Sequence, residues 1–187
     1  MAVDNNRAAI LAAVQLMDGG DAVGAEKALK KILKGKPKHL EANLNLAIVY
    51  VQQEKFGRAL RHLKPVVAQN DKIALAHRLI GDCFLGLRKP QDSARAYQRA
   101  VTIDPNLSDC WFNLGLMQRQ IKEPDHAVAA FKNAIELAPG FRKAHEQMGL
   151  TLIETGNYNE GLAALTKGSG FIVFDNKGSS PYRIVTS

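Results

Sequence analysis

Histidine and glycine are the residue types in this sequence that could carry catalytic, metal-binding or phosphate-binding chemistry. The five histidines do not stand at the short spacings that metal ligands require. No carboxylate is placed with His126 as a catalytic dyad or triad would need. Gly168-Ser169-Gly170 is a lone Gly-x-Gly without the longer pattern of a nucleotide-binding loop, and we interpret it as a flexible joint. The sequence therefore predicts no enzyme, no cofactor and no metal site.

The two cysteines, Cys83 and Cys110, do not form a Cys-x-x-Cys pair and have no histidine at metal-ligand spacing. Both fall in segments with the apolar spacing of a helix, so we expect two buried thiols. Reduced thiols fit a reducing compartment. No apolar run approaches the length that crosses a bilayer. We therefore expect a soluble, cytoplasmic protein.

The net charge of +7 is concentrated near the start of the chain, where residues 1–73 contain 12 Lys or Arg against 7 Asp or Glu. Six lysines account for this excess: Lys27, Lys30, Lys31, Lys34, Lys36 and Lys38. On a helix these positions avoid Ala25 and Leu29, so they point away from the apolar face. No arginine or aromatic residue is interleaved with them, as a nucleic-acid site would require. We expect a solvated basic ridge rather than a nucleic-acid or membrane site.

The elements that would position these residues recur at a fixed spacing. Residues 108–141 form the clearest unit, because apolar residues recur there at three- and four-residue spacings in two successive segments. Pro124 stands at the start of the second segment, and Pro139 with Gly140 ends it. This pattern predicts a helical hairpin. It recurs in register at residues 6–39, 40–73, 74–107, 108–141 and 142–167.

The residues that carry a family resemblance are Trp111, Leu114, Gly115, Ala127, Phe131 and Pro139. Their spacing is similar to that of the tetratricopeptide repeat family, and the resemblance covers residues 6–167. It implies an all-α, right-handed solenoid of about five helical hairpins. The sequence departs from the family at Asp71, where a proline is expected, and after Leu165, where the fifth repeat loses the pattern.

Two columns of small residues run through the repeats and predict close helix packing. The first column is Ala13, Ala47, Gly81, Gly115 and Gly149, and the second is Ala25, Ala59, Ser93, Ala127 and Gly161. The larger residues Leu29, Leu63, Tyr97, Phe131 and Leu165 recur at the same period. We expect them to fill the space between successive units. These residues are therefore assigned to packing, with no chemical role.

By the pattern of the family, the first helices of the repeats line a concave groove. The candidate peptide-binding residues are Asn45, Arg78, Asp82, Phe112, Asn113, Arg119, Lys143 and Gln147. Amides, mixed charges and apolar side chains on one face suit an extended or helical peptide. The resemblance implies a non-catalytic scaffold or adaptor that binds a protein or peptide partner. The alternative is the N-terminal recruiting or regulatory arm of a larger transferase or oxygenase.

Some members of the family grip the C-terminal acid of a chaperone with a two-carboxylate clamp. Arg78, Asn113 and Lys143 stand at suitable places for such a clamp. Asp82 stands where the clamp has asparagine, and it would repel a carboxylate. Gln147 stands where the clamp has arginine. The sequence therefore argues against this kind of ligand.

Residues 168–187 form a tail of a different composition. Phe171–Phe174 and Tyr182–Val185 are short β-prone runs, and residues 175–178 between them have turn chemistry. An isolated two-stranded hairpin is marginally stable in water. We expect the tail to cover the exposed end of repeat five, to mimic a ligand in the groove, or to lead into a further domain. The tail and the ends of the array are also the places where we expect any self-association.

Overall fold

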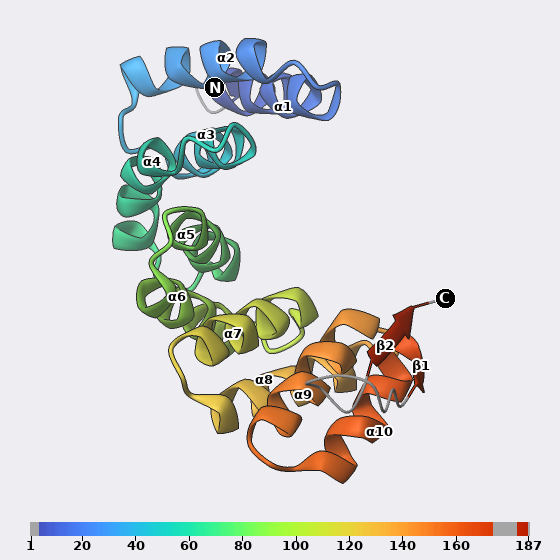
Figure 1. Ribbon diagram of the computed structural model, residues 1–187. Helices are drawn as coiled ribbons and strands as arrows, with labels where there is room; N and C mark the ends of the chain where they lie inside the picture. Colours follow the sequence, from blue (N-terminus) through green and yellow to red (C-terminus); the bar gives the residue numbers. More distant parts are fainter. Residues whose placement is uncertain (1–3, 174–182, 187) are drawn as a thin grey trace. The chain divides into compact units, whose positions relative to one another are not determined.

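The computed structural model describes residues 4–173 and 183–186. In this part the chain forms ten α-helices followed by two β-strands, coloured along the sequence in Figure 1. The elements are α1 Asp4–Asp18, α2 Ala22–Gly35, α3 Leu40–Gln52, α4 Phe56–Gln69, α5 Ala74–Gly86, α6 Pro90–Ile103, α7 Ser108–Gln120, α8 Pro124–Leu137, α9 Arg142–Glu154, α10 Tyr158–Ser169, β1 Gly170–Val173 and β2 Arg183–Thr186. The prediction of an all-α repeat of helical hairpins with a strand-like tail is confirmed.

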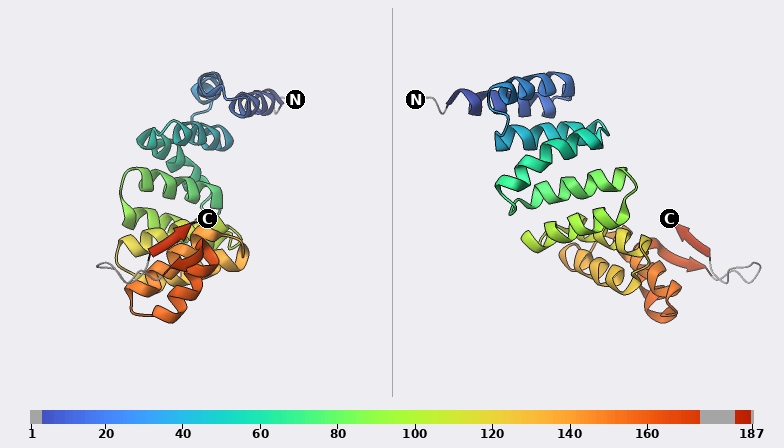
Figure 2. Two further views of the ribbon diagram at one scale, coloured as in Figure 1. Left: turned by 45° about the vertical axis from the view of Figure 1, so that its right-hand side comes forward. Right: turned by 90° about the vertical axis from the view of Figure 1, so that its left-hand side faces the viewer.

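The chain divides into two compact units, Met1–Ile103 and Asp104–Ser187. The first unit contains the hairpins α1–α2, α3–α4 and α5–α6, and the second contains α7–α8 and α9–α10 (Figure 2). Within the first unit, successive hairpins pack through α2 on α3 and α4 on α5. Within the second unit, α8 packs on α9. Each hairpin therefore buries its apolar face against a neighbour in its own unit.

The five turns inside the hairpins share one backbone design. Each contains a residue with a φ between 56° and 86° at the same repeat position: Gly20, Glu54, Arg88, Lys122 and Gly156. The next amide donates to the carbonyl five residues earlier, over distances of 2.8 to 2.9 Å. These bonds satisfy carbonyls that the end of the first helix would otherwise leave without a partner. The turn geometry is therefore retained in three repeats that lack a glycine there.

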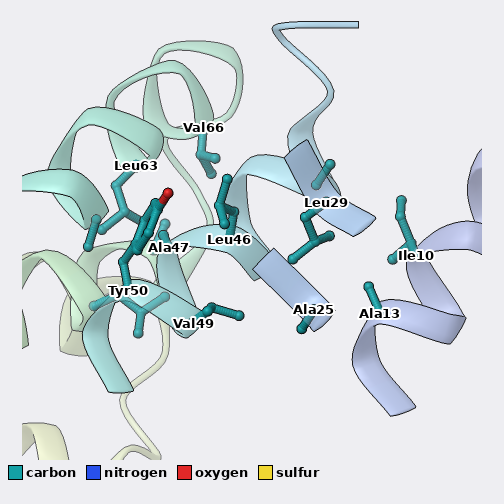
Figure 3. Close-up of a cluster of buried hydrophobic side chains, with 14 of the residues drawn as sticks. Ile10, Ala13, Ala25, Leu29, Leu46, Ala47, Val49, Tyr50, Leu63 and Val66 are labelled. Atoms are coloured by element: carbon teal, nitrogen blue, oxygen red, sulfur yellow. The ribbon is translucent and has the colours of Figure 1, made fainter. Parts of the chain in front are cut away.

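The core of the first unit contains buried side chains from α1, α2, α3 and α4, part of which Figure 3 shows. Leu29 from α2 and Leu63 from α4 are fully buried beside the small residues Ala13 and Ala47. Asp21 caps the start of α2, because its Oδ1 atom accepts a hydrogen bond of 2.8 Å from the amide of Gly24. Four lysines of the basic ridge lie on α2, and Lys36 and Lys38 follow it. All six are exposed, which confirms their outward placement.

The close helix packing expected at the small residues is seen in both units, where Tyr97 and Phe131 each lie against the glycine of their own hairpin. A Cβ atom on Gly81 would lie 2.7 Å from the ring of Tyr97 in the first unit. A Cβ atom on Gly115 would lie 2.6 Å from the ring of Phe131 in the second. Real Cβ atoms do not approach neighbours this closely, so glycine is what lets each aromatic ring lie against the helix backbone.

The tail continues directly from α10 within the second unit. β1 and β2 pair antiparallel, with Phe171 opposite Val185 and Ile172 opposite Ile184, and both strands lie beside α10 (Figures 1 and 2). The predicted turn at residues 175–178 lies outside the described residues. The interpretation of Gly168 as part of a flexible joint is wrong. Gly168 is buried in α10, where an added Cβ atom would lie 2.8 Å from the amide nitrogen of Glu146.

Candidate functional site

The fourth residue of each of the helices α3, α5, α7 and α9 binds the loop that precedes its helix. A side-chain nitrogen lies within hydrogen-bond distance of the backbone carbonyl six residues earlier in each case. The pairs are Asn43 with Pro37 at 2.9 Å, His77 with Asp71 at 3.0 Å, Trp111 with Pro105 at 2.8 Å and His145 with Pro139 at 3.0 Å. Different residue types perform one task because all of them can supply an N–H donor. His77 and His145 are therefore structural residues.

We call the residues predicted to bind a peptide in the first unit its first-helix face: Asn45 on α3, and Arg78 and Asp82 on α5. The helices α3 and α5 lie side by side, and all three side chains are half-buried. Asn45 donates to the carbonyl of Glu41 on its own helix at 3.0 Å. Asp82 accepts a hydrogen bond of 2.6 Å from the hydroxyl of Tyr97. Arg78 makes no hydrogen bond or ion pair with another described residue.

The corresponding face of the second unit comprises Phe112, Asn113 and Arg119 on α7 together with Lys143 and Gln147 on α9. Arg119 and Gln147 contact each other directly, because Nη1 of Arg119 donates to Oε1 of Gln147 at 2.8 Å. The same guanidinium binds both carboxylate oxygens of Glu154, with Nε 3.1 Å from Oε2. Sequence reasoning missed Glu154, although an acidic residue one repeat and one position beyond Arg119 was visible.

The other residues of this face differ in their exposure. Phe112 is half-buried, and its ring centroid lies 4.8 Å from that of Phe141 and 5.9 Å from that of Phe131. Asn113 is half-buried, whereas Lys143 is exposed at the start of α9. Phe112 thus belongs to an aromatic cluster inside the unit, and only part of its ring is available to a ligand.

The environment of Cys83 opposes nucleophilic chemistry by its thiol. Burial, followed by the nearby charge of Asp82, raises the pKa of the Cys83 thiol to about 12. A thiol with such a pKa stays protonated at neutral pH and is a poor nucleophile. Cys110 is buried as well, so the expectation of two buried thiols is confirmed. In the part of the chain that the structure describes, no three His, Cys, Asp or Glu residues could hold a metal ion.

Two models of the tetratricopeptide repeat match this chain, at residues 16–83 and 108–141. The chain belongs to the tetratricopeptide repeat family. Trp111, whose indole binds the carbonyl of Pro105, opens the motif in the fourth repeat. No helix within the described ranges has the length and apolar character that a membrane crossing demands.

The relatives match most of this chain, but the match covers very different shares of their own lengths. The human protein O-mannosyl-transferase TMTC3 is 26% identical over 141 residues, which cover 71% of this chain and only 15% of the transferase. The crystal structure of MamA is 28% identical, with a TM-score of 0.79, and the match covers 83% of this chain and 91% of MamA. YrrB, described as a TPR protein with an unusual peptide-binding site, is 22% identical over 87% of this chain and 84% of its own, with a TM-score of 0.78. At that identity YrrB supports the fold alone.

Proposed function

We propose that this chain is a non-catalytic interaction module that binds a peptide or protein segment along its first helices. The observation that carries the proposal is Arg78, a half-buried guanidinium with no partner among the described residues. Arginine offers five N–H donors and cannot lose its charge in a protein. A carboxylate or backbone carbonyl of a bound segment would satisfy it.

The surroundings of Arg78 suit a segment with mixed chemistry. Leu44 and Ile48 on the neighbouring helix α3 are half-buried and offer apolar contact. Asp82 lies one helical turn after Arg78 and already accepts a hydrogen bond from the hydroxyl of Tyr97. A backbone carbonyl fits beside this carboxylate better than a free acid, because two carboxylates repel each other. The internal part of a peptide is therefore the favoured ligand, rather than its C-terminal acid.

In the second unit we assign the ligand contacts to Asn113 and Lys143. Lys143 is exposed and makes no ion pair with any described residue. Arg119 and Gln147 have a supporting role in this proposal, because their hydrogen-bonding groups already hold each other and Glu154. We also propose a cytoplasmic location, since Cys83 and Cys110 are free thiols that suit a reducing compartment.

Affinity purification with the full chain, followed by titration of the recovered partner, tests this function. We expect Arg78→Ala to lower the affinity for the partner by about tenfold to a hundredfold, because a charged hydrogen bond to a ligand is worth about 1.5–3 kcal/mol. Lys64→Ala is the matched control, because Lys64 is exposed on the second helix α4 of the same unit. Equal affinities of the two variants, with the melting temperature unchanged, would contradict the proposal.

The alternative is a recruiting arm of a larger enzyme, and the similarity to the transferase TMTC3 favours it as the second candidate. That similarity covers 71% of this chain. In this case the natural partner on the first-helix face is an enzyme substrate, or the face regulates a catalytic domain. Co-purification of the chain with a transferase activity, lost in Arg78→Ala, supports this reading over a stand-alone adaptor.

A further inference from the structure

The turns of the second and third repeats border a shallow hollow of about 630 Å³ in the first unit, which is wide open to solvent. Its lining residues are Glu54, Lys55, Phe56, Gly57, Arg58, Arg61 and Leu87. They come from the turn before α4, from the first two turns of α4 and from the residue that follows α5. Asn45, Arg78 and Asp82 of the first-helix face are not among them.

The base of the hollow is formed where Phe56 meets the end of α5. The ring of Phe56 lies directly on the backbone of Gly86, in the space that a Cβ atom there would occupy. This close approach fixes the two turns against each other. Leu85 and Leu87 remain 40% and 41% exposed at the same end of α5. Of these two leucines, Leu87 lines the hollow and offers it an exposed apolar side chain.

The charges around the hollow are nearly all positive. Lys55, Arg58 and Arg61 line it, and only Glu54 opposes them. None of these three cations forms an ion pair with any described residue. The guanidinium of Arg58 lies 5.9 Å from the centroid of the Tyr50 ring, which orients it without neutralising it.

We propose that this hollow docks an acidic peptide segment of a partner protein that carries an apolar side chain. The carboxylates would pair with Arg58 and Arg61, and the apolar side chain would cover Leu87. Charge complementarity favours this occupant, since none of the three cations forms an ion pair with a described residue and Leu87 is exposed in the same hollow. Single-stranded nucleic acid fits less well, because the one aromatic ring of the lining is already stacked on Gly86 and unavailable to a base.

A fluorescein-labelled peptide of alternating glutamate and leucine is the probe, titrated into the full chain and followed by fluorescence anisotropy. We expect Arg58→Glu with Arg61→Glu to lower the affinity by about tenfold or more, because each reversal replaces attraction with repulsion. Leu87→Ser should lower it by about threefold. The matched control is Lys27→Glu with Lys31→Glu, which changes the net charge equally at exposed positions of α2 and should change the affinity by less than about twofold.

Three outcomes would overturn the proposal. The first is an absence of peptide binding by the unchanged chain. The second is an equal loss of affinity in both double variants, which would mean that only net charge matters. The third is binding of phosphatidylserine vesicles or oligonucleotides that depends on Arg58 and Arg61 while the peptide does not bind. Arg78→Ala should leave the probe's affinity unchanged, so failure here is distinguishable from failure of the first-helix proposal.

Discussion

The ends of the first helices are held together differently in the two units. In the second unit Arg119, near the end of α7, binds Gln147 and Glu154 on α9. The equivalent positions in the first unit are Val51 and Gly86, where no ion pair can form. There the ring of Phe56 occupies the space above Gly86 instead. The charged contact therefore joins two first helices, α7 and α9, whereas the apolar contact joins the end of α5 to the start of the second helix α4.

This difference changes what each unit leaves available for binding. Arg119 is committed to its neighbours, whereas Arg78 in the first unit has no partner among the described residues. Arg58 and Arg61, which share a hollow with the exposed Leu87, also form no ion pair with any described residue. Both residues predicted as ligand-binding arginines, Arg78 and Arg119, lie on first helices.

The largest expected effect is the loss of stability on replacing the packed glycine of each unit, and it tests whether the two units are alike away from their helix ends. Gly81→Ala and Gly115→Ala should each destabilise the chain by about 1–3 kcal/mol, because the new methyl group overlaps an aromatic ring. Gly81→Ala should cost more, since moving the Tyr97 ring also strains its hydrogen bond to Asp82. Urea unfolding followed by circular dichroism measures both.

Gly57→Ala provides the control for these two glycines. Gly57 is helical and exposed, with no atom within 4 Å of an added Cβ, so alanine there should stabilise by about 0.5–1 kcal/mol. If Gly81→Ala and Gly115→Ala were as stable as Gly57→Ala, the small and large residues would not be packed as described.

The second prediction compares the two arginines directly. Arg119→Ala should lower the stability by about 1 kcal/mol, a modest value because the side chains of Arg119 and Glu154 are 29% and 56% exposed and solvent screens their attraction. Arg78→Ala should change the stability by less than about 0.5 kcal/mol, because no bond within the chain is lost. A loss for Arg78→Ala as large as for Arg119→Ala would mean that Arg78 has an internal role.

The hairpin repeats could be predicted from sequence because the spacing of apolar and small residues alone decides which faces are buried. Gly81 and Tyr97 illustrate this, since their repeat positions were enough to assign both to packing, although the contact between them within one hairpin was not predicted. The hairpin turns were harder to read, because Glu54, Arg88 and Lys122 adopt a left-handed conformation that glycine prefers. Only the shared repeat position connects them with Gly20 and Gly156.

The partners of polar side chains could not be predicted in the same way. Asn43, His77, Trp111 and His145 look unrelated, and their shared N–H donor to the preceding loop emerges only when the carbonyls are in place. Arg119 was predicted to bind a ligand because its repeat position indicates which helix face it lies on. That position does not indicate that Gln147 and Glu154 bind it within the chain. The assignment of Gly168 to a joint failed for a related reason. A glycine in α10 is required by the close backbone of α9, which composition does not reveal.

The last prediction concerns a titrating contact that the first unit has and the second lacks. His62 on α4 is half-buried, with Nδ1 2.9 Å from Oδ1 of Asn43. The amide group of Asn43 donates to Pro37 and His39, so its oxygen is the acceptor and Nδ1 carries the proton. The equivalent of His62 in the fourth repeat is Ala130, which cannot titrate.

Burial, and then the charges of Arg61 and Lys30, lower the pKa of His62 below its usual 6.5. The unfolded chain therefore takes up a proton near pH 6.5 while the folded chain still resists it, and stability falls as the pH falls from there towards the folded pKa. Above pH 6.5 this group contributes no pH dependence.

We expect the unchanged chain to lose more thermal stability than His62→Gln between about pH 7.5 and 5.5. Glutamine retains an N–H donor for Asn43 and does not titrate. Circular dichroism measures the melting temperatures, and the fluorescence of the single tryptophan, Trp111, reports the second unit separately. An identical pH response of both proteins would show that folding does not change the pKa of His62.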